Sequence, residues 1–292
     1  MFKLSVITDE VSQDLQTAVN LAKEFNLDGI EIRSVWEKDP QNLDESDIRR
    51  IREIVTRNKL QVSCIASPFF KCDLDNPKEY DQHIEILEKC VRLAKELDTN
   101  IIRGFAFWRK GKLEDYLDRI IDQYQKPLGI IEKEKVILGV ENEASTSLGN
   151  GRELKLFLDR IESPNVKVVW DPGNNISTWT LAEKGEIPYP DGYELIKDKI
   201  VHVHIKDLCL NPDTGKGEAV PLGTGEVDYP GQFRALIRDN YNGYVSLETH
   251  YRPKVRLDED IVQRPVGSAF SADGEAGSRE CLENLRRMLK EL

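Results

Sequence analysis

The feature that most constrains the fold of this 292-residue chain is a regular alternation of short apolar runs with amphipathic stretches. The apolar runs have the character of parallel strands that are buried on both faces. We predict eight such strands, at residues 3–8, 30–33, 60–66, 100–105, 136–141, 166–171, 200–206 and 243–248. No Gly-rich dinucleotide fingerprint follows the first of them, which counts against a Rossmann domain.

Helical patterns separate the predicted strands. Apolar residues recur at helical spacing in 15–25, 46–58, 80–97, 113–131, 153–161, 176–197 (with a break at 187–190), 232–239 and 279–289. We expect irregular loops at 207–228 and 252–278. Alternating strands and helices predict a parallel α/β sheet. Eight units in about 300 residues match a closed (β/α)8 TIM barrel, and we expect residues 1–292 to form this single domain.

Composition narrows the classes of partner. The formal net charge is −11, from 52 acidic and 41 basic residues, and it opposes binding to nucleic acid or to an anionic membrane. Five cysteines without a C-x-x-C spacing fit reduced thiols in the cytoplasm. No apolar run approaches the ~20 residues of a membrane span, and the N-terminus turns acidic too early for a signal peptide. We therefore expect a cytoplasmic protein with a small-molecule substrate, either monomeric or a homo-oligomer.

The strand at 200–206 carries polar residues inside an apolar run. Alternation places His202, His204 and Lys206 on one face, where each needs a partner if it is buried. His204 lies nearer the C-terminal end of the strand and is the better candidate ligand, while His202 belongs one layer deeper. Lys206 is a candidate substrate contact or a lysine at the rim.

Three other predicted strands end on a carboxylate, at Glu141, Asp171 and Glu248. Strand C-termini meet at one face of a parallel barrel, so these residues and His204 are expected to converge. A single strand-end carboxylate is more often a helix cap or a surface charge, but four consecutive strands share this pattern. Crowded carboxylates repel one another unless a cation joins them. Three oxygens and one imidazole suit Mn²⁺, Mg²⁺, Co²⁺ or Zn²⁺.

Five motifs together resemble the sugar phosphate isomerase/epimerase group of the xylose isomerase-like TIM barrels. They are VENE at 140–143, WDPGN at 170–174, HVHIKD at 202–207, GTGEVD at 223–228 and GYVSLE at 243–248, and the resemblance spans nearly the whole chain. It implies one divalent ion, Mn²⁺ foremost, held by Glu141, Asp171, His204 and Glu248. It also implies that Glu141 and Glu248 move protons. Some ketose epimerases of the group have a histidine three residues after the aspartate, where this chain has Asn174.

The resemblance predicts a metal-dependent isomerase or epimerase that acts on a sugar, a sugar phosphate or a related polyol ketone through an enediolate. Loss of water from the same enediolate would instead make a dehydratase of an inosose-like ketone. An endonuclease of the same superfamily needs more imidazoles than the four histidines available. A non-catalytic sugar-binding barrel is the remaining alternative, and the intact ligand set argues against it.

Further polar residues at or after strand ends are expected to bind substrate hydroxyls or a phosphate. They are Lys206, Asn174, His250, Arg103 and Lys71, and each has a surface or structural role as its alternative. Gly223, Thr224 and Gly225 follow the seventh predicted strand, where barrels often bind phosphate. Ordinary turn chemistry explains these glycines equally well.

Overall fold

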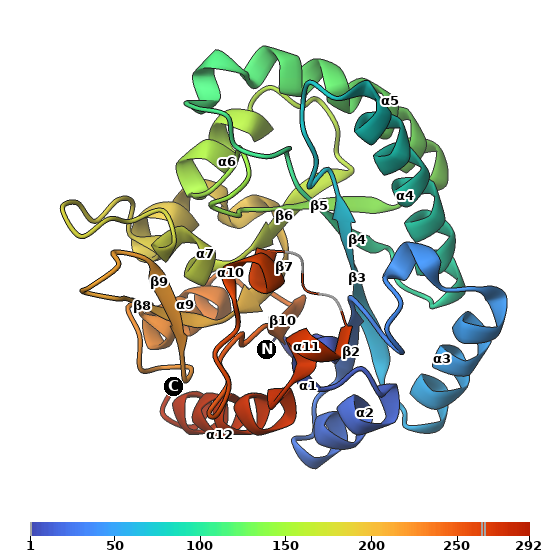
Figure 1. The fold of residues 1–292 in the computed structure, drawn as a ribbon, viewed down its shortest axis with the longest axis vertical. Coiled ribbons are helices and arrows are strands. Elements are labelled where there is room, and N and C mark those ends of the chain that lie inside the picture. Colours follow the sequence, from blue (N-terminus) through green and yellow to red (C-terminus); the bar gives the residue numbers. More distant parts are fainter. Residues whose placement is uncertain (1, 264, 266) are drawn as a thin grey trace.

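A computed structural model describes residues 2–263, 265 and 267–292. Its eight-stranded sheet is parallel, with the strand order β1-β10-β7-β6-β5-β4-β3-β2. The strands are β1 (Lys3–Val6), β2 (Gly29–Ile32), β3 (Gln61–Phe69), β4 (Ile101–Gly104), β5 (Ile137–Glu141), β6 (Val166–Trp170), β7 (Ile200–Ile205) and β10 (Tyr244–Leu247). A parallel bridge between Ile7 and Glu31 joins the two ends of this order. The predicted (β/α)8 barrel is confirmed (Figure 1).

Helices surround the strands as an outer layer (Figure 1). The longer ones are α2 (Leu15–Glu24), α3 (Glu45–Arg57), α4 (Pro77–Glu96), α5 (Leu117–Glu134), α6 (Gly151–Leu158), α9 (Tyr229–Arg238) and α12 (Gly274–Lys290). Their starts follow from local chemistry, since Asp14 caps α2 and a capping box of Asp44 and Asp47 opens α3. Their apolar faces pack on the sheet, and the core lies between the two layers.

The predicted helix at 176–197 is wrong over most of its length. The chain forms α7 (Pro172–Ile176) and then an irregular stretch. Short helical turns follow at η3 (Pro188–Gly192), α8 (Tyr193–Ile196) and η4 (Lys197–Lys199). The backbone carbonyl of Glu186 accepts hydrogen bonds from the side chains of Asn175 (2.6 Å) and Trp179 (3.0 Å). These bonds fold the intervening segment back on itself as a loop, a tertiary effect that the periodicity does not show.

Two predicted loops also contain regular structure. The segment at 207–228 includes an antiparallel hairpin of β8 (Asp207–Leu210) and β9 (Gly217–Val220). Its turn is closed by the Asn211 side chain, which accepts from the backbone N–H groups of Asp213 and Thr214. The segment at 252–278 contains the short helices α10 (Glu259–Gln263) and α11 (Gly267–Ser271) and the start of α12.

Asp207 organises the glycine-containing turn that follows the hairpin. Its Oδ2 accepts hydrogen bonds from the N–H groups of Gly223 and Gly225, each at 2.9 Å. Gly223 has a φ of +83°, a conformation that favours glycine. The backbone donors of this turn are therefore engaged by a carboxylate of the same chain, and turn chemistry accounts for the glycines without a phosphate.

Within the described residues, no helix has the length and apolar character that a bilayer span requires.

Candidate active site

Four residues from consecutive strands of the barrel converge at its C-terminal mouth. Glu141 ends β5, Asp171 follows β6, His204 lies in β7 and Glu248 follows β10. Each offers one ligand atom, and these atoms all lie within 4.8 Å of one another. All four side chains are buried. The structure thus brings together the four residues that the strand ends predicted.

The His204 ring is held from both sides. Its Nδ1 lies 2.9 Å from Glu141 Oε1 and 3.4 Å from Glu248 Oε2, while its Nε2 lies 3.0 Å from Glu31 Oε1. Burial lowers the pKa of His204, but the Glu31 and Glu141 carboxylates outweigh it and raise the pKa well above its usual value. Nδ1 is the nitrogen that faces Glu141 and Glu248, and Nε2 is the one that faces Glu31.

Glu31, on β2, also anchors the deeper histidine. Its Oε2 lies 2.8 Å from His202 Nε2, and the buried Cys64 thiol is a further hydrogen-bonding neighbour. His202 lies one layer below His204, as predicted, and belongs to a separate buried group with Glu31 and Cys64. Our sequence reasoning missed Glu31. The alternation Ile30-Glu31-Ile32-Arg33 was the available signal, because it places two charged residues on the inner face of a strand.

Asp171 has two structural tasks besides its place in the cluster. Its Oδ1 accepts the N–H of Asn174 at 3.0 Å and so caps α7, while its Oδ2 accepts from Lys206 Nζ at 2.7 Å. Burial raises the pKa of Asp171 to about 7; Lys206 opposes this shift, and the Glu248 and Glu141 carboxylates add to it. An ionised Asp171 is thus costly here even with the Lys206 ammonium beside it.

The two glutamates share one arrangement. Each has an oxygen near His204 Nδ1, and each has its other oxygen near an arginine. Glu141 Oε2 lies 3.2 Å from Arg103 Nη1, and Glu248 Oε1 lies 2.5 Å from Arg33 Nη1 and 3.8 Å from Arg103 Nη1. Burial raises the pKa of Glu248, but Lys206 and His204 more than offset this and lower it well below its usual range. Glu248 is therefore an ionised carboxylate.

A second network surrounds Arg33 at the ends of β1 and β2. Arg33 donates to Asp9 (3.0 Å) and Glu10 (2.7 Å), and Arg252 donates to Glu10 at 3.1 Å. Sequence reasoning did not single out Asp9 or Glu10, because acidic residues after a first strand resemble an ordinary helix start. These pairs fix the guanidinium that contacts Glu248.

The residues predicted to bind substrate lie around this mouth. Lys206 Nζ contacts Asp171 and Glu248, and Arg103 lies beside both glutamates. Asn174 Nδ2 lies 3.3 Å from Glu141 Oε1, and His250 Nε2 lies 3.2 Å from Glu10 and 3.6 Å from Glu248. Lys71 lies in the next shell, where its ammonium pairs with Glu143 at 3.2 Å. Their roles toward a substrate stay predictions.

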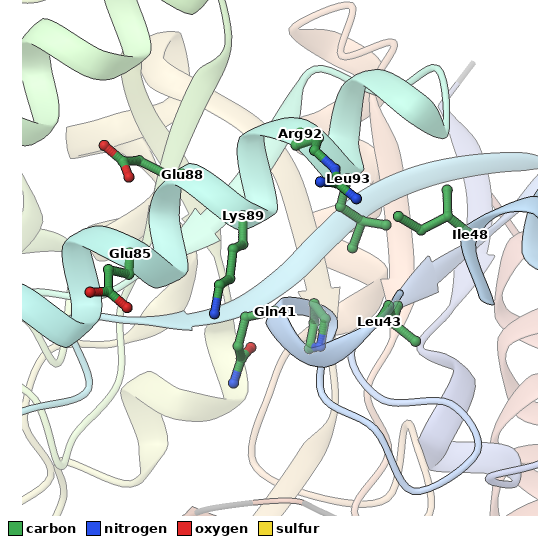
Figure 2. Close-up of a pocket in the computed structure, with 9 residues that line it drawn as sticks. Gln41, Leu43, Ile48, Glu85, Glu88, Lys89, Arg92 and Leu93 are labelled. Carbon is green, nitrogen blue, oxygen red and sulfur yellow. The ribbon is translucent and has the colours of Figure 1, made fainter. Parts of the chain in front are cut away.

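A pocket on the outer surface of the barrel is separate from this mouth. Its volume is 430 Å³, and it lies between the segment around Gln41 and Leu43 and the helix α4 (Figure 2). Its lining includes Glu85, Lys89 and Leu93 and contains none of the predicted site residues. The residues that the sequence singled out therefore all lie outside this pocket.

A model of the xylose isomerase-like TIM barrel matches residues 19–291, which is nearly the whole chain. This chain belongs to the xylose isomerase-like TIM barrel family.

Two curated relatives are similar in sequence to part of this chain. A protein of Escherichia coli (strain K12), provisionally named an L-ribulose-5-phosphate 3-epimerase, is 28% identical over 170 residues. An inosose dehydratase of Clostridium perfringens is 26% identical over 145 residues, which cover 44% of this chain and 46% of the relative. The match to the first relative covers 56% of either protein, so the chain spans only a little over half its length.

A solved structure supports the same fold over the full length. The D-allulose 3-epimerase from Methylomonas sp. superposes with a TM-score of 0.72 at 17% identity and covers 98% of both chains. The barrel architecture therefore extends across the whole of this family member.

The four clustered residues fit a divalent cation. Three carboxylates and one imidazole form a hard donor set, and the donors already lie close to a common point. The second nitrogen of His204 is held by Glu31, the arrangement that orients metal-binding histidines. Mn²⁺, Mg²⁺, Co²⁺ and Zn²⁺ all suit such a set.

We predict that Glu31 is needed for the stability of this arrangement. Glu31→Ala leaves the Nε2 atoms of two buried imidazoles without the carboxylate that they share, so the free energy of unfolding should fall by about 3–5 kcal/mol. Glu31→Gln keeps an acceptor oxygen and should cost about 1–2 kcal/mol. Guanidinium denaturation of the metal-free protein measures both, with the exposed Glu53→Ala as the control. A Glu31→Ala variant as stable as the control would contradict this role.

Proposed function

We propose that this protein is a divalent-metal-dependent epimerase or isomerase of a ketose, a ketose phosphate or a related polyol ketone. The observation that carries the proposal is the convergence of Glu141, Asp171, His204 and Glu248 at one barrel mouth. A relative named for ribulose-5-phosphate epimerisation and a similar structure named for allulose epimerisation support the same reaction class. Mn²⁺ is the proposed ion.

A divalent ion held by these four residues would polarise a substrate carbonyl and stabilise the negative charge of an enediolate. The protein's own contribution is the movement of a proton. Glu141 Oε2 and Glu248 Oε1 lie against arginines rather than His204 Nδ1, and we propose that these oxygens carry the proton. One glutamate removes a proton from the carbon beside the carbonyl. If the other returns a proton to the opposite face, that centre is inverted, whereas return to the neighbouring carbon isomerises the sugar.

Arg103 lies beside both glutamates. Its Nη1 lies 3.2 Å from Glu141 Oε2 and 3.8 Å from Glu248 Oε1, so one guanidinium reaches both proton-carrying oxygens. A substrate that enters between the glutamates comes within reach of the Arg103 donors. We propose that Arg103 binds a substrate hydroxyl and keeps the glutamates ionised. Lys206, Asn174, His250 and Lys71 are proposed further substrate contacts.

Exchange of solvent deuterium into substrate tests this function. Ketoses, ketose phosphates and inososes are incubated in D₂O with the Mn²⁺-loaded protein and followed by NMR. We expect deuterium at the carbon beside the carbonyl of at least one substrate. EDTA should abolish the exchange and leave the far-UV circular dichroism unchanged, because a barrel of this size has its own core. Exchange that persists in EDTA would contradict metal dependence, and elimination of water without epimer formation would make the protein a dehydratase.

The two glutamates and the aspartate should differ when they are substituted. Glu141→Gln and Glu248→Gln each remove a base, so kcat should fall by about 10²–10⁴-fold and excess metal should not restore it. Asp171→Asn mainly weakens binding of the ion, so added metal should restore much of its activity. The measurement is kcat against metal concentration for all three variants. Full recovery of either glutamine variant at high metal would rule out proton transfer by that glutamate.

A further inference from the structure

Lys206 lies among the acidic residues of the candidate site. Its ammonium is 2.7 Å from Asp171 Oδ2 and 2.8 Å from Glu248 Oε2, and the side chain is only 4% exposed. It therefore pairs with two of the four residues that would hold the metal ion. Burial lowers the pKa of Lys206, but Asp171, Glu248 and Glu141 raise it above its ordinary value, so Lys206 is a full cation.

The surrounding structure is shaped around this lysine. A Cβ at residue 173 would lie 2.8 Å from Lys206 Cγ and 2.5 Å from its carbonyl oxygen, so glycine at this position makes room for the stem. The Tyr229 hydroxyl donates to the Lys206 carbonyl at 2.6 Å. Packing and backbone hydrogen bonding thus hold the start of the side chain, while its ammonium is held by charge-assisted hydrogen bonds to Asp171 and Glu248.

The other cations at the site contact different atoms. Arg33 and Arg103 lie against Glu248 Oε1 and Glu141 Oε2, the oxygens turned away from His204 Nδ1. Lys206 contacts Glu248 Oε2, which lies 3.4 Å from His204 Nδ1 and so faces the common point of the ligands. The ammonium and a divalent ion would therefore use the same oxygens. Their positive charges would repel strongly at such a short separation in a buried site.

We propose that Lys206 is a built-in counter-ion that competes with the divalent metal for Asp171 and Glu248. In the metal-free protein its ammonium neutralises carboxylates that would otherwise repel one another. When the metal binds, the ammonium leaves these two oxygens and becomes available to the substrate. This inference rests on the proposed metal-dependent function. It adds that Lys206 lowers the affinity of the site for the divalent ion.

Calorimetric titration of metal-free protein with Mn²⁺ tests the competition, in wild type and in Lys206→Met. A neighbouring charge changes the proton affinity of a carboxylate by about 10- to 1,000-fold. Because removal of the Lys206 charge should affect binding of a cation in the same way, we expect Lys206→Met to bind Mn²⁺ at least about tenfold more tightly than wild type does. The metal-free variant should melt at a lower temperature than wild type, and Mn²⁺ should raise its Tm by more. Lys206→Gln is a second variant that keeps a polar side chain, and circular dichroism checks that both fold.

Lys155→Met is the matched control, because it removes one positive charge from a half-exposed lysine that is paired with Asp159 and lies outside the candidate site. Its Mn²⁺ affinity should stay close to that of wild type. If the Lys206 variants bind Mn²⁺ no more tightly than wild type does, the competition is overturned while the metal site stands. If neither wild type nor the variants bind Mn²⁺, the proposed metal-dependent function fails and the competition fails with it.

Discussion

The dominant constraint on the site is the electrostatic repulsion among three carboxylates that are buried at one end of the barrel. Glu141, Asp171 and Glu248 lie so close together that their ionisation is costly without a cation. Neighbouring positively charged side chains offset this repulsion. Lys206 contacts Asp171 and Glu248, Arg103 lies beside Glu141 and Glu248, and Arg33 contacts Glu248 from the other side. A divalent ion at the same point would relieve the repulsion further, and this is the physical reason why a metal suits these residues.

The barrel topology creates this crowding. β5, β6, β7 and β10 are neighbours in the sheet, so their C-terminal ends deliver four side chains to one region. Closure of the sheet through β1 and β2 brings Glu31 across the interior to His204. The same closure places Arg33 against Glu248. Residues more than 150 positions apart in sequence thus fix one imidazole and one carboxylate.

The sequence predicted the barrel and the four clustered residues, because strand alternation and strand ends are local properties. It did not predict the loop after α7, in which the Trp179 side chain donates to the Glu186 carbonyl, or the β8–β9 hairpin. Glu31 was missed although it alternates with apolar residues, because its two histidine partners lie on a strand more than 150 residues away. The position of the Lys206 ammonium depends on the space beside Gly173 and on two carboxylates from other strands. Such tertiary relations have no signature in a single sequence.

The most direct test of the account is the position of a bound ion. Crystals grown with Mn²⁺ and measured at the manganese absorption edge would reveal it by anomalous scattering. We predict one strong peak within about 2.0–2.6 Å of His204 Nδ1 and of an oxygen from each of Glu141, Asp171 and Glu248. A mouth without a peak, or a peak only at the deeper group of Glu31, Cys64 and His202, would contradict the account.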